Sequence, residues 1–316
     1  MKKIVLLLLF SPLLLIGQTS LLDAEKLIEN KQPLKAEKDL ILFINNNSNN
    51  LQATELLGDA YGHQKKWDEA IEQYKQLVDA KPAEANYHYK YGGALGMKAL
   101  IISKIRALSI IGDVKEAFLK AAELDPNHID ARWALVELYM QLPGIIGGSK
   151  SKSFKYANEL EKLSKVDGYL AKGYIYEYDK EPDLAEKFYK LAIKEGGSIT
   201  CYDKLTKLYE KEGKSTEAIS NLEAAHLKHK RNVMHYQIGK VCADYNVQLE
   251  KGEFCLKVYI DNYSSKDGVP KALAYYRLAQ IYKHKKDKAE SLIWIEKAIK
   301  HLPEIEVFKT FKNTLN

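Results

Sequence analysis

Residues 51–84 repeat, at fixed spacings, the side-chain sizes that two packed antiparallel helices require. Counting the first of these residues as position 1, small residues stand at position 8 (Gly58) and position 20 (Ala70), and a large one, Tyr74, stands at position 24. Small residues let two helices approach closely, and Pro82 at position 32 ends the second helix. The stretch therefore predicts a helix, a turn and a second helix packed against the first.

The same size pattern returns along the chain. It recurs in units that begin near residues 85, 129, 166, 199, 232 and 272, and a shortened copy precedes it in residues 20–50. Each unit buries its apolar face only against its neighbours, so the units stack into one continuous body. We predict an all-α fold, a right-handed α-solenoid of about eight helical hairpins over residues 20–316. The tail from Glu304 is predicted to form a C-terminal helix that caps the open apolar end.

The pattern resembles the tetratricopeptide repeat (TPR), whose unit is about 34 residues long. The middle of the chain is also similar to a group of exported bacterial TPR proteins of unassigned function. The matching stretches are residues 116–153, which contain the segment PGIIGG, and, more loosely, residues 236–260 and 272–292. The resemblance implies a TPR scaffold with a glycine-rich loop, and it brings no known activity with it.

The first twenty residues have the three-part form of a secretory signal. Two lysines precede an apolar run from Ile4 to Ile16, and a small residue, Gly17, follows the run. This run is shorter than the roughly 20 residues that span a bilayer. We expect a signal peptide at residues 1–19 and a mature chain that is soluble in the periplasm or cell envelope. An uncleaved membrane anchor is the alternative.

The charge distribution argues against a nucleic-acid partner. The formal net charge of +6 is spread over 316 residues, and acidic residues are interleaved with basic ones throughout. Nucleic-acid binding requires a basic face, and the densest basic run, residues 228–231, is too short to provide one.

Two repeats are longer than the period allows. About ten residues are inserted within residues 96–113 and about five within residues 142–150, in both cases between the first and second helix of a repeat. The inserts should therefore share one edge of the stack. They form either a lobe that docks a partner or a membrane surface, or a patch in which the second insert simply packs on the first. The predicted insert edge comprises Ile101, Ile105, Leu108, Pro143, Ile145 and Ile146.

The TPR resemblance implies a concave groove lined by the first helix of each repeat. In the middle repeats, aromatic and methionine residues occupy several of the groove-facing positions. Such side chains bind peptides by stacking and adaptable packing, although tyrosines at these positions could instead pack on adjacent helices. The predicted groove residues are Tyr89, Trp133, Glu137, Met140, Tyr174, Tyr178, Tyr236 and Tyr276.

The chain has three cysteines, Cys201, Cys242 and Cys255. Cys242 ends one predicted helix and Cys255 lies early in the next, so an oxidising compartment would allow a disulfide between them. Burial of both as free thiols is the alternative. No histidine or acidic residue is placed to activate a cysteine, and no catalytic motif occurs. His226, His229 and His235 lie around one turn, but interleaved lysines oppose a bound cation, so we interpret them as solvated turn residues. We predict no enzymatic activity, no cofactor and no metal site.

Together these features predict a non-enzymatic, exported scaffold that binds a protein or peptide through the groove, the insert edge or both. The alternative is a membrane-proximal envelope assembly factor whose apolar insert edge touches lipid or an envelope protein.

Overall fold

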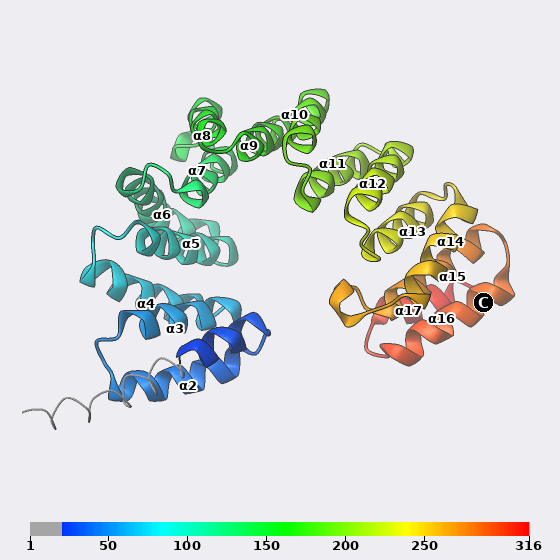
Figure 1. The fold of residues 1–316 in the computed structure, drawn as a ribbon, viewed down its shortest axis with the longest axis horizontal. Helices are drawn as coiled ribbons and strands as arrows, with labels where there is room; N and C mark the ends of the chain where they lie inside the picture. The colour runs from blue at the N-terminus through cyan, green and yellow to red at the C-terminus, as the bar shows by residue number, and fades with distance from the viewer. Residues whose placement is uncertain (1–20, 316) are drawn as a thin grey trace, which may run out of the picture. The chain divides into compact units, whose positions relative to one another are not determined.

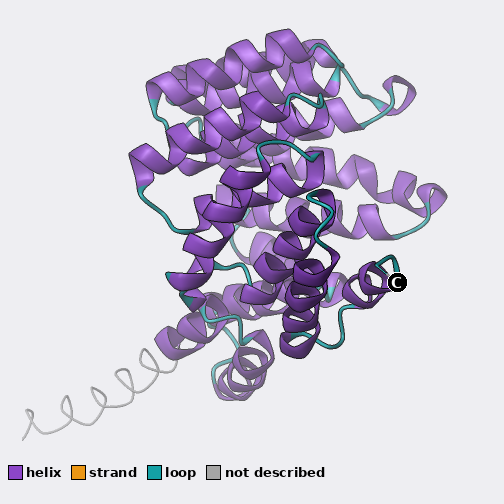
Figure 2. Cartoon of the chain, turned by 90° about the vertical axis from the view of Figure 1, so that its right-hand side faces the viewer, coloured by secondary structure: helices purple, strands orange, loops and turns teal. Residues whose placement is uncertain are grey.

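A computed structural model describes residues 21–315, which form an all-helical chain (Figures 1 and 2). No strand occurs within these residues. Their helices pair into eight hairpins followed by one terminal helix, which confirms the predicted stack of helical hairpins. The predicted signal peptide, residues 1–19, lies outside the described residues.

The chain divides into two compact units, Met1–Leu163 and Ser164–Asn316. The described part of unit 1 begins with a helix over residues 21–29. The other helices of unit 1 are α2 (Pro33–Asn46), α3 (Leu51–His63), α4 (Trp67–Ala80), α5 (Ala85–Ile101), α6 (Lys104–Leu124), α7 (Ile129–Gln141), the 3-10 turn η1 (Gly144–Ile146) and α8 (Lys150–Leu163).

Unit 2 continues the same alternation of first and second helices. Its elements are α9 (Lys165–Tyr178), α10 (Pro182–Glu195), α11 (Ile199–Lys211), α12 (Ser215–His229), α13 (Val233–Tyr245), α14 (Leu249–Asp261), the 3-10 turn η2 (Ser265–Asp267), α15 (Lys271–His284), α16 (Lys288–His301) and α17 (Glu306–Asn313).

Small residues lie where the two helices of a hairpin meet. A β-carbon added to Gly58 on α3 would lie 2.6 Å from the ring of Tyr74 on α4. A β-carbon on Gly173 of α9 would lie 2.3 Å from the ring of Tyr189 on α10. Each tyrosine thus occupies the space that the facing glycine leaves open, and this pairing fixes the register of the hairpin.

The last helix covers the apolar end of unit 2. Phe308 of α17 is fully buried, and its ring centroid lies 5.2 Å from that of Tyr276 on α15. Phe308 shares a core cluster with Ile295 of α16 and with Leu315. This helix therefore caps the stack at the place where no further repeat follows within the described residues.

The first insert lengthens two helices instead of forming a separate lobe. Helix α5 has 17 residues and α6 has 21, whereas α3 and α4 of the preceding hairpin have 13 and 14. Helix α5 is therefore about one turn longer than α3, and α6 about two turns longer than α4.

Among the helices of the described residues, none combines the length and the apolar character needed to cross a membrane.

Candidate functional site

In unit 1, a polar cluster around Lys90 joins the first helices α3 and α5. The Lys90 ammonium lies 2.7 Å from Glu55 Oε1 and 2.8 Å from Asp59 Oδ2. Tyr74 donates a 2.7 Å hydrogen bond to Asp59. Burial alone would lower the pKa of Lys90, but the two carboxylates outweigh it and raise that pKa. The charges of this cluster therefore hold neighbouring repeats together.

In unit 2, opposite charges also pair between successive first helices. The pairs are Glu177 with Lys211, Glu210 with Lys240, and Asp244 with Arg277. In each pair the partner lies 30 to 34 residues further along the chain, about one repeat. Sequence reasoning missed these pairs, although a comparison of charges one repeat apart would have found them.

Helix α9 carries the most exposed of the predicted groove tyrosines. Tyr178 is 48% exposed, and its ring centroid lies 6.1 Å from that of Tyr174, one helical turn earlier. Lys204 of α11 places its ammonium 6.0 Å from the Tyr174 ring centroid, within reach of a cation–π interaction. Two neighbouring rings with a cation beside them suit a peptide that presents an aromatic or acidic side chain.

In unit 1, some of the predicted groove residues pack against other side chains and others remain exposed. The Tyr89 ring lies 5.1 Å from His128 and 6.0 Å from Phe118, measured between centroids. Burial raises the pKa of Tyr89, and the nearby carboxylates of Asp130 and Glu137 raise it further. Tyr89 is thus part of the junction between repeats.

Trp133 and Glu137, both on α7, remain at the surface of unit 1. Trp133 is half-buried and Glu137 is exposed. One helical turn separates them, so they lie on the same face of α7.

The structure places two predicted groove residues in the core. Tyr236 is buried with its ring centroid 5.5 Å from that of Tyr259, and Tyr263 and Val269 of the following loop pack on the same core cluster. Met140 is buried in the last turn of α7, where the chain folds back and the Ser149 amide donates a 2.8 Å hydrogen bond to the Tyr139 carbonyl. The prediction that Met140 and Tyr236 line an open groove is wrong.

Tyr276 is the third predicted groove tyrosine that packs against neighbouring aromatic side chains. It is half-buried on α15, with its ring centroid 5.4 Å from that of Phe311 in addition to its contact with Phe308. The terminal helix therefore covers much of this side chain.

The insert edge is largely uncovered. Ile105 is 83% exposed and Ile145 is 96% exposed, and Ile101, Leu108 and Pro143 are exposed as well. Ile146 is partly buried. The alternative in which the second insert simply packs on the first is therefore wrong for Ile145.

Glycines shape the second insert. Gly147 adopts a φ of 101°, a conformation that other residues rarely take. A β-carbon on Gly148 would lie 1.7 Å from the carbonyl oxygen of Leu142, so only glycine fits there. The tight turn presents Ile145 to the outside.

Cys242 on α13 and Cys255 on α14 are buried free thiols in the structure. Burial raises the pKa of Cys242 to about 12, and the neighbouring Cys255 contributes to that rise. Burial also raises the pKa of Cys255 to about 11. Both thiols are therefore protonated at neutral pH and poorly nucleophilic. The disulfide between them stays a prediction.

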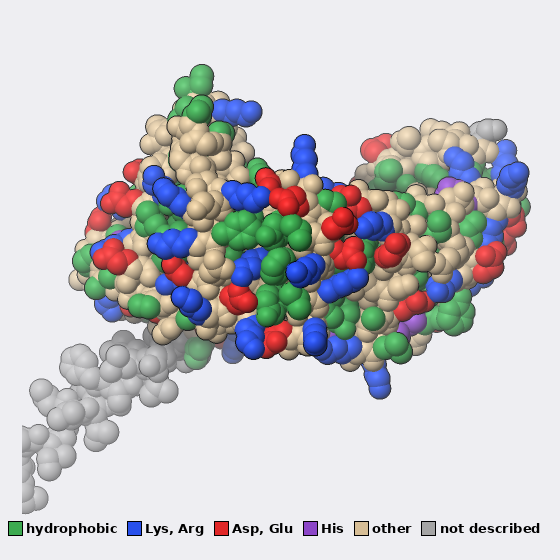
Figure 3. Space-filling view, turned by 90° about the horizontal axis from the view of Figure 1, so that it is seen from above, with side chains coloured by type: hydrophobic (Ala, Val, Ile, Leu, Met, Phe, Trp, Pro, Cys, Tyr) green, Lys and Arg blue, Asp and Glu red, His purple; other side chains and the backbone are tan. Residues whose placement is uncertain are grey.

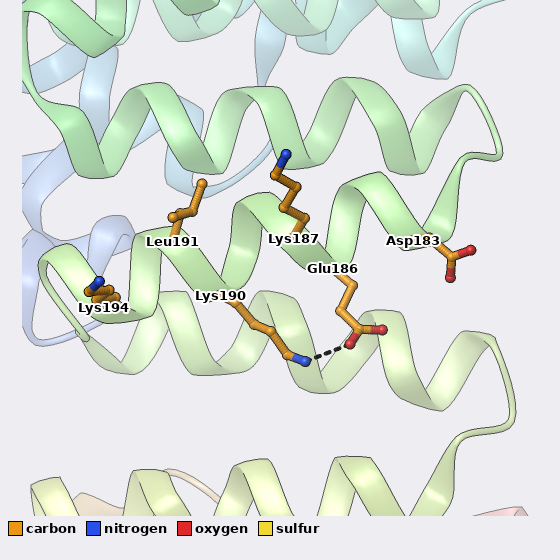
Figure 4. Close-up of a pocket in the computed structure, with 6 residues that line it drawn as sticks. All are labelled: Asp183, Glu186, Lys187, Lys190, Leu191 and Lys194. Carbon is orange, nitrogen blue, oxygen red and sulfur yellow. Dashed lines mark hydrogen bonds and ion pairs between the residues drawn. The ribbon is translucent and has the colours of Figure 1, made fainter.

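A surface depression along α10 does not have the features of a small-molecule site (Figure 4). Its lining residues are Asp183, Glu186, Lys187, Lys190, Leu191 and Lys194, all from that one helix. Glu186 already accepts hydrogen bonds from Lys190 at 2.7 Å and from Tyr209 at 3.1 Å. Ligand sites usually gather polar groups from several elements. We therefore assign no ligand to this depression.

Charged side chains of both signs are interspersed on the face that Figure 3 presents. Within residues 21–315, no group of three or more His, Cys, Asp or Glu side chains is arranged to hold a metal ion.

Stacked helical hairpins with small residues at their contacts define an α-helical repeat protein. Family models described as "Tetratricopeptide repeat" match residues 33–95, 166–195 and 272–300. The chain therefore carries tetratricopeptide repeats over these residues. Proteins of this family are generally non-catalytic scaffolds, and the fold suggests a protein-binding scaffold.

Two solved structures share the fold at low sequence identity. One is a tetratricopeptide repeat protein from Parabacteroides merdae ATCC 43184, with a TM-score of 0.50, 14% identity, and coverage of 95% of this chain and 98% of that chain. The other is TTC0263, a thermophilic TPR protein in Thermus thermophilus, with a TM-score of 0.51, 14% identity, and coverage of 61% of this chain and 97% of that chain. No curated protein matches the chain.

Proposed function

We propose that the chain is a non-enzymatic scaffold that binds a protein or peptide on the first helices of its repeats. The observation that carries the proposal is the tyrosine pair on α9, in which Tyr178 stands exposed beside Tyr174. Exposed aromatic residues on a rigid helix are typical anchors of protein interfaces, because they bury a large area at a small entropic cost.

The surroundings of the pair define the chemistry of the peptide. Glu177, between the two tyrosines, is held by Tyr189 at 2.8 Å and by Lys211 at 3.4 Å. Its negative charge is therefore compensated within the fold, while Lys204 stands over the Tyr174 ring. The partner should present an aromatic or acidic side chain to α9.

Peptide selection tests this proposal. Peptides selected from a displayed library on the purified protein are measured against wild type, a Tyr174→Ala/Tyr178→Ala variant and a Phe254→Ala control. Phe254 is a comparably exposed aromatic residue on the second helix α14. We expect at least about tenfold weaker binding by the double variant and unchanged binding by the control. Selected peptides that bind the double variant as tightly as wild type would contradict the proposal.

We further propose that the scaffold is exported and works in the periplasm or cell envelope. This part rests on the leader pattern at residues 1–19. Cell fractionation with mass spectrometry of the intact chain tests it. The expected result is an extracytoplasmic chain shortened near Gly17–Thr19, and a full-length chain confined to the cytoplasm would contradict it.

A second candidate function is a membrane-proximal envelope assembly factor. The exposure of Ile105 and Ile145 on the insert edge favours it, because folded chains seldom leave several large aliphatic side chains uncovered together. In this role the insert edge would touch lipid or an envelope protein. The two candidate functions use different elements, so one chain can perform both.

A further inference from the structure

The end of the α5–α6 hairpin is an apolar tip. Leu100 and Ile101 close α5, and Ile105 and Leu108 open α6. All four side chains are more than half exposed, and Ile105 is the most exposed of them at 83%. The extra length of α5 and α6 supplies this tip, since the preceding α3–α4 hairpin has no corresponding turns.

The second insert adds to the same edge. Both inserts connect the first and second helices of adjacent repeats, and the η1 turn lies next to α6. A β-carbon on Gly147 would lie 3.9 Å from the ammonium of Lys115, a residue of α6. Ile145, 96% exposed, therefore belongs to the same edge of unit 1 as the tip.

Basic residues outnumber acidic ones along this edge, where Asp113, the last residue of the first insert, is the one acidic residue in residues 96–113 and 142–157. Residues 96–112 contain Lys98, Lys104 and Arg106, and residues 142–157 contain three more lysines. Neither segment contains an Asp or Glu, although the whole chain has 42 of them in 316 residues. Lys98 pairs with Asp68, whereas the structure gives Lys104 and Arg106 no carboxylate partner among the described residues.

We propose that the α5–α6 tip inserts into the interfacial layer of an anionic lipid bilayer. Ile101 and Ile105 enter the acyl region, and Lys104 and Arg106 bind lipid phosphates. Interfacial elements of this kind bury an apolar face roughly 5–10 Å deep and gain affinity from basic residues beside it. The proposal rests on the second candidate function and names the partner of that surface.

The exposure of the side chains favours lipid over protein as the partner. Side chains as exposed as Ile105 and Ile145 stand clear of their neighbours on most sides. A fluid acyl layer surrounds such projecting groups without a shaped receptor. A protein partner would need a pocket matched to each of them.

Vesicle flotation tests the proposal in the chain from Ser20 onward, because every described helix lies within residues 21–315. The same variants in the full chain show whether the leader changes the result. The vesicles contain either phosphatidylglycerol with phosphatidylethanolamine, or phosphatidylcholine alone. Wild type should bind the anionic vesicles, and Ile101→Ser/Ile105→Ser should lower the partition coefficient by at least about tenfold. The control Leu227→Ser changes a similarly exposed residue of α12 and should have no effect.

A charge variant separates the contribution of the basic side chains to vesicle binding from that of the apolar side chains. Lys104→Gln/Arg106→Gln should weaken binding to anionic vesicles by roughly fivefold for each cation removed, and added salt should reproduce the loss. Binding of this variant to neutral vesicles should equal that of wild type. Circular dichroism should show unchanged helicity, since all four substituted side chains are exposed.

A fluorescent label reports insertion directly. An environment-sensitive dye on Ile105→Cys should shift to the blue with anionic vesicles, and the same dye on Leu227→Cys should not. The three native cysteines are buried and should leave the label specific.

Two results would overturn the proposal. The first is wild type that stays unbound by anionic vesicles or binds them no better than the Ile101→Ser/Ile105→Ser variant. The second is a tip variant that loses an envelope protein while wild type ignores vesicles, which would assign the tip to a protein partner. Peptide binding by α9 does not depend on either result, so the two proposals can fail separately.

Discussion

The carboxylate of Glu253 on α14 accepts a 2.6 Å hydrogen bond from the ammonium of Lys285, in the turn before α16. Tyr282 and Lys257 donate to the same carboxylate at 2.7 Å and 2.6 Å. Burial alone would raise the pKa of Glu253, but the three donors outweigh it and lower that pKa to about 2. This group of side chains, the Glu253 clasp, joins the second helix α14 of one repeat to the first helix α15 and the following turn of the next repeat.

The clasp recurs along the chain. In unit 2, Glu186 of α10 accepts from Tyr209 and from Lys214 in the turn before α12. In unit 1, Glu37 of α2 accepts from Lys66 in the turn before α4. The pKa of both carboxyls is lowered, because hydrogen bonds from lysine outweigh the opposing effect of burial.

The Glu253 clasp predicts a pH-dependent contribution to stability. The pKa of Glu253 is lower in the folded chain than the ordinary value of 4.5. Its contribution is therefore fully present above about pH 4.5 and is lost as the pH falls toward 2. Glu253→Gln should lower the free energy of unfolding by about 1 kcal/mol at pH 7, and the difference from wild type should disappear near pH 2.

Urea denaturation of both proteins across this pH range measures the effect. Glu212→Gln is the matched control, since Glu212 is an exposed residue at the end of α11. A loss that is equal in the two variants, or that persists unchanged at pH 2, would speak against the clasp.

The close approach of hairpin helices predicts opposite effects for two glycine substitutions. Gly173→Ala places a methyl group 2.3 Å from the Tyr189 ring and should lower the free energy of unfolding by roughly 1–3 kcal/mol. Gly93→Ala, within α5, meets no atom within 4 Å and should raise it by about 0.5–1 kcal/mol through helix propensity. Thermal denaturation measures the stability of both variants relative to wild type. A Gly173→Ala variant more stable than wild type would contradict the close approach of α9 and α10.

The repeat architecture could be predicted because one physical constraint recurs with the period. Wherever two helices of a hairpin meet, a small residue must face a large one, as Gly58 faces Tyr74 and Gly173 faces Tyr189. The pattern also indicated where the period fails. It could not indicate that the first insert would lengthen α5 and α6, since Leu and Ile are compatible with either a longer helix or a separate lobe.

The candidate sites were less predictable, because groove positions are defined by an ideal repeat. In the α13–α14 repeat, Tyr263 and Val269 of the loop that follows pack on the core cluster that contains Tyr236. The terminal helix likewise covers Tyr276. Exposure of Tyr178 depends on what the neighbouring helices leave uncovered, which a local pattern does not contain.

The burial of the cysteines predicts their reactivity. In the folded chain, Cys201, Cys242 and Cys255 should all resist iodoacetamide at pH 8, because they are buried and the pKa of the last two is raised to about 12 and 11. Mass spectrometry after alkylation in denaturant without reductant separates the two alternatives for Cys242 and Cys255, and three modified thiols would establish that both are free. A single modified thiol would instead establish a disulfide, and Cys201 as the modified residue would place it between Cys242 and Cys255.

We propose that this chain is a scaffold that binds a protein or peptide on α9. Photo-crosslinking in living cells tests it most directly, with a photoreactive amino acid in place of Tyr178 in one variant and of Phe254 in another. Both positions are exposed, so they differ in the helix that carries them. We predict a discrete crosslinked partner at position 178 that is absent at position 254 and is lost when Tyr174→Ala is added. The absence of any crosslink at position 178, or the same products at both positions, would contradict the claim.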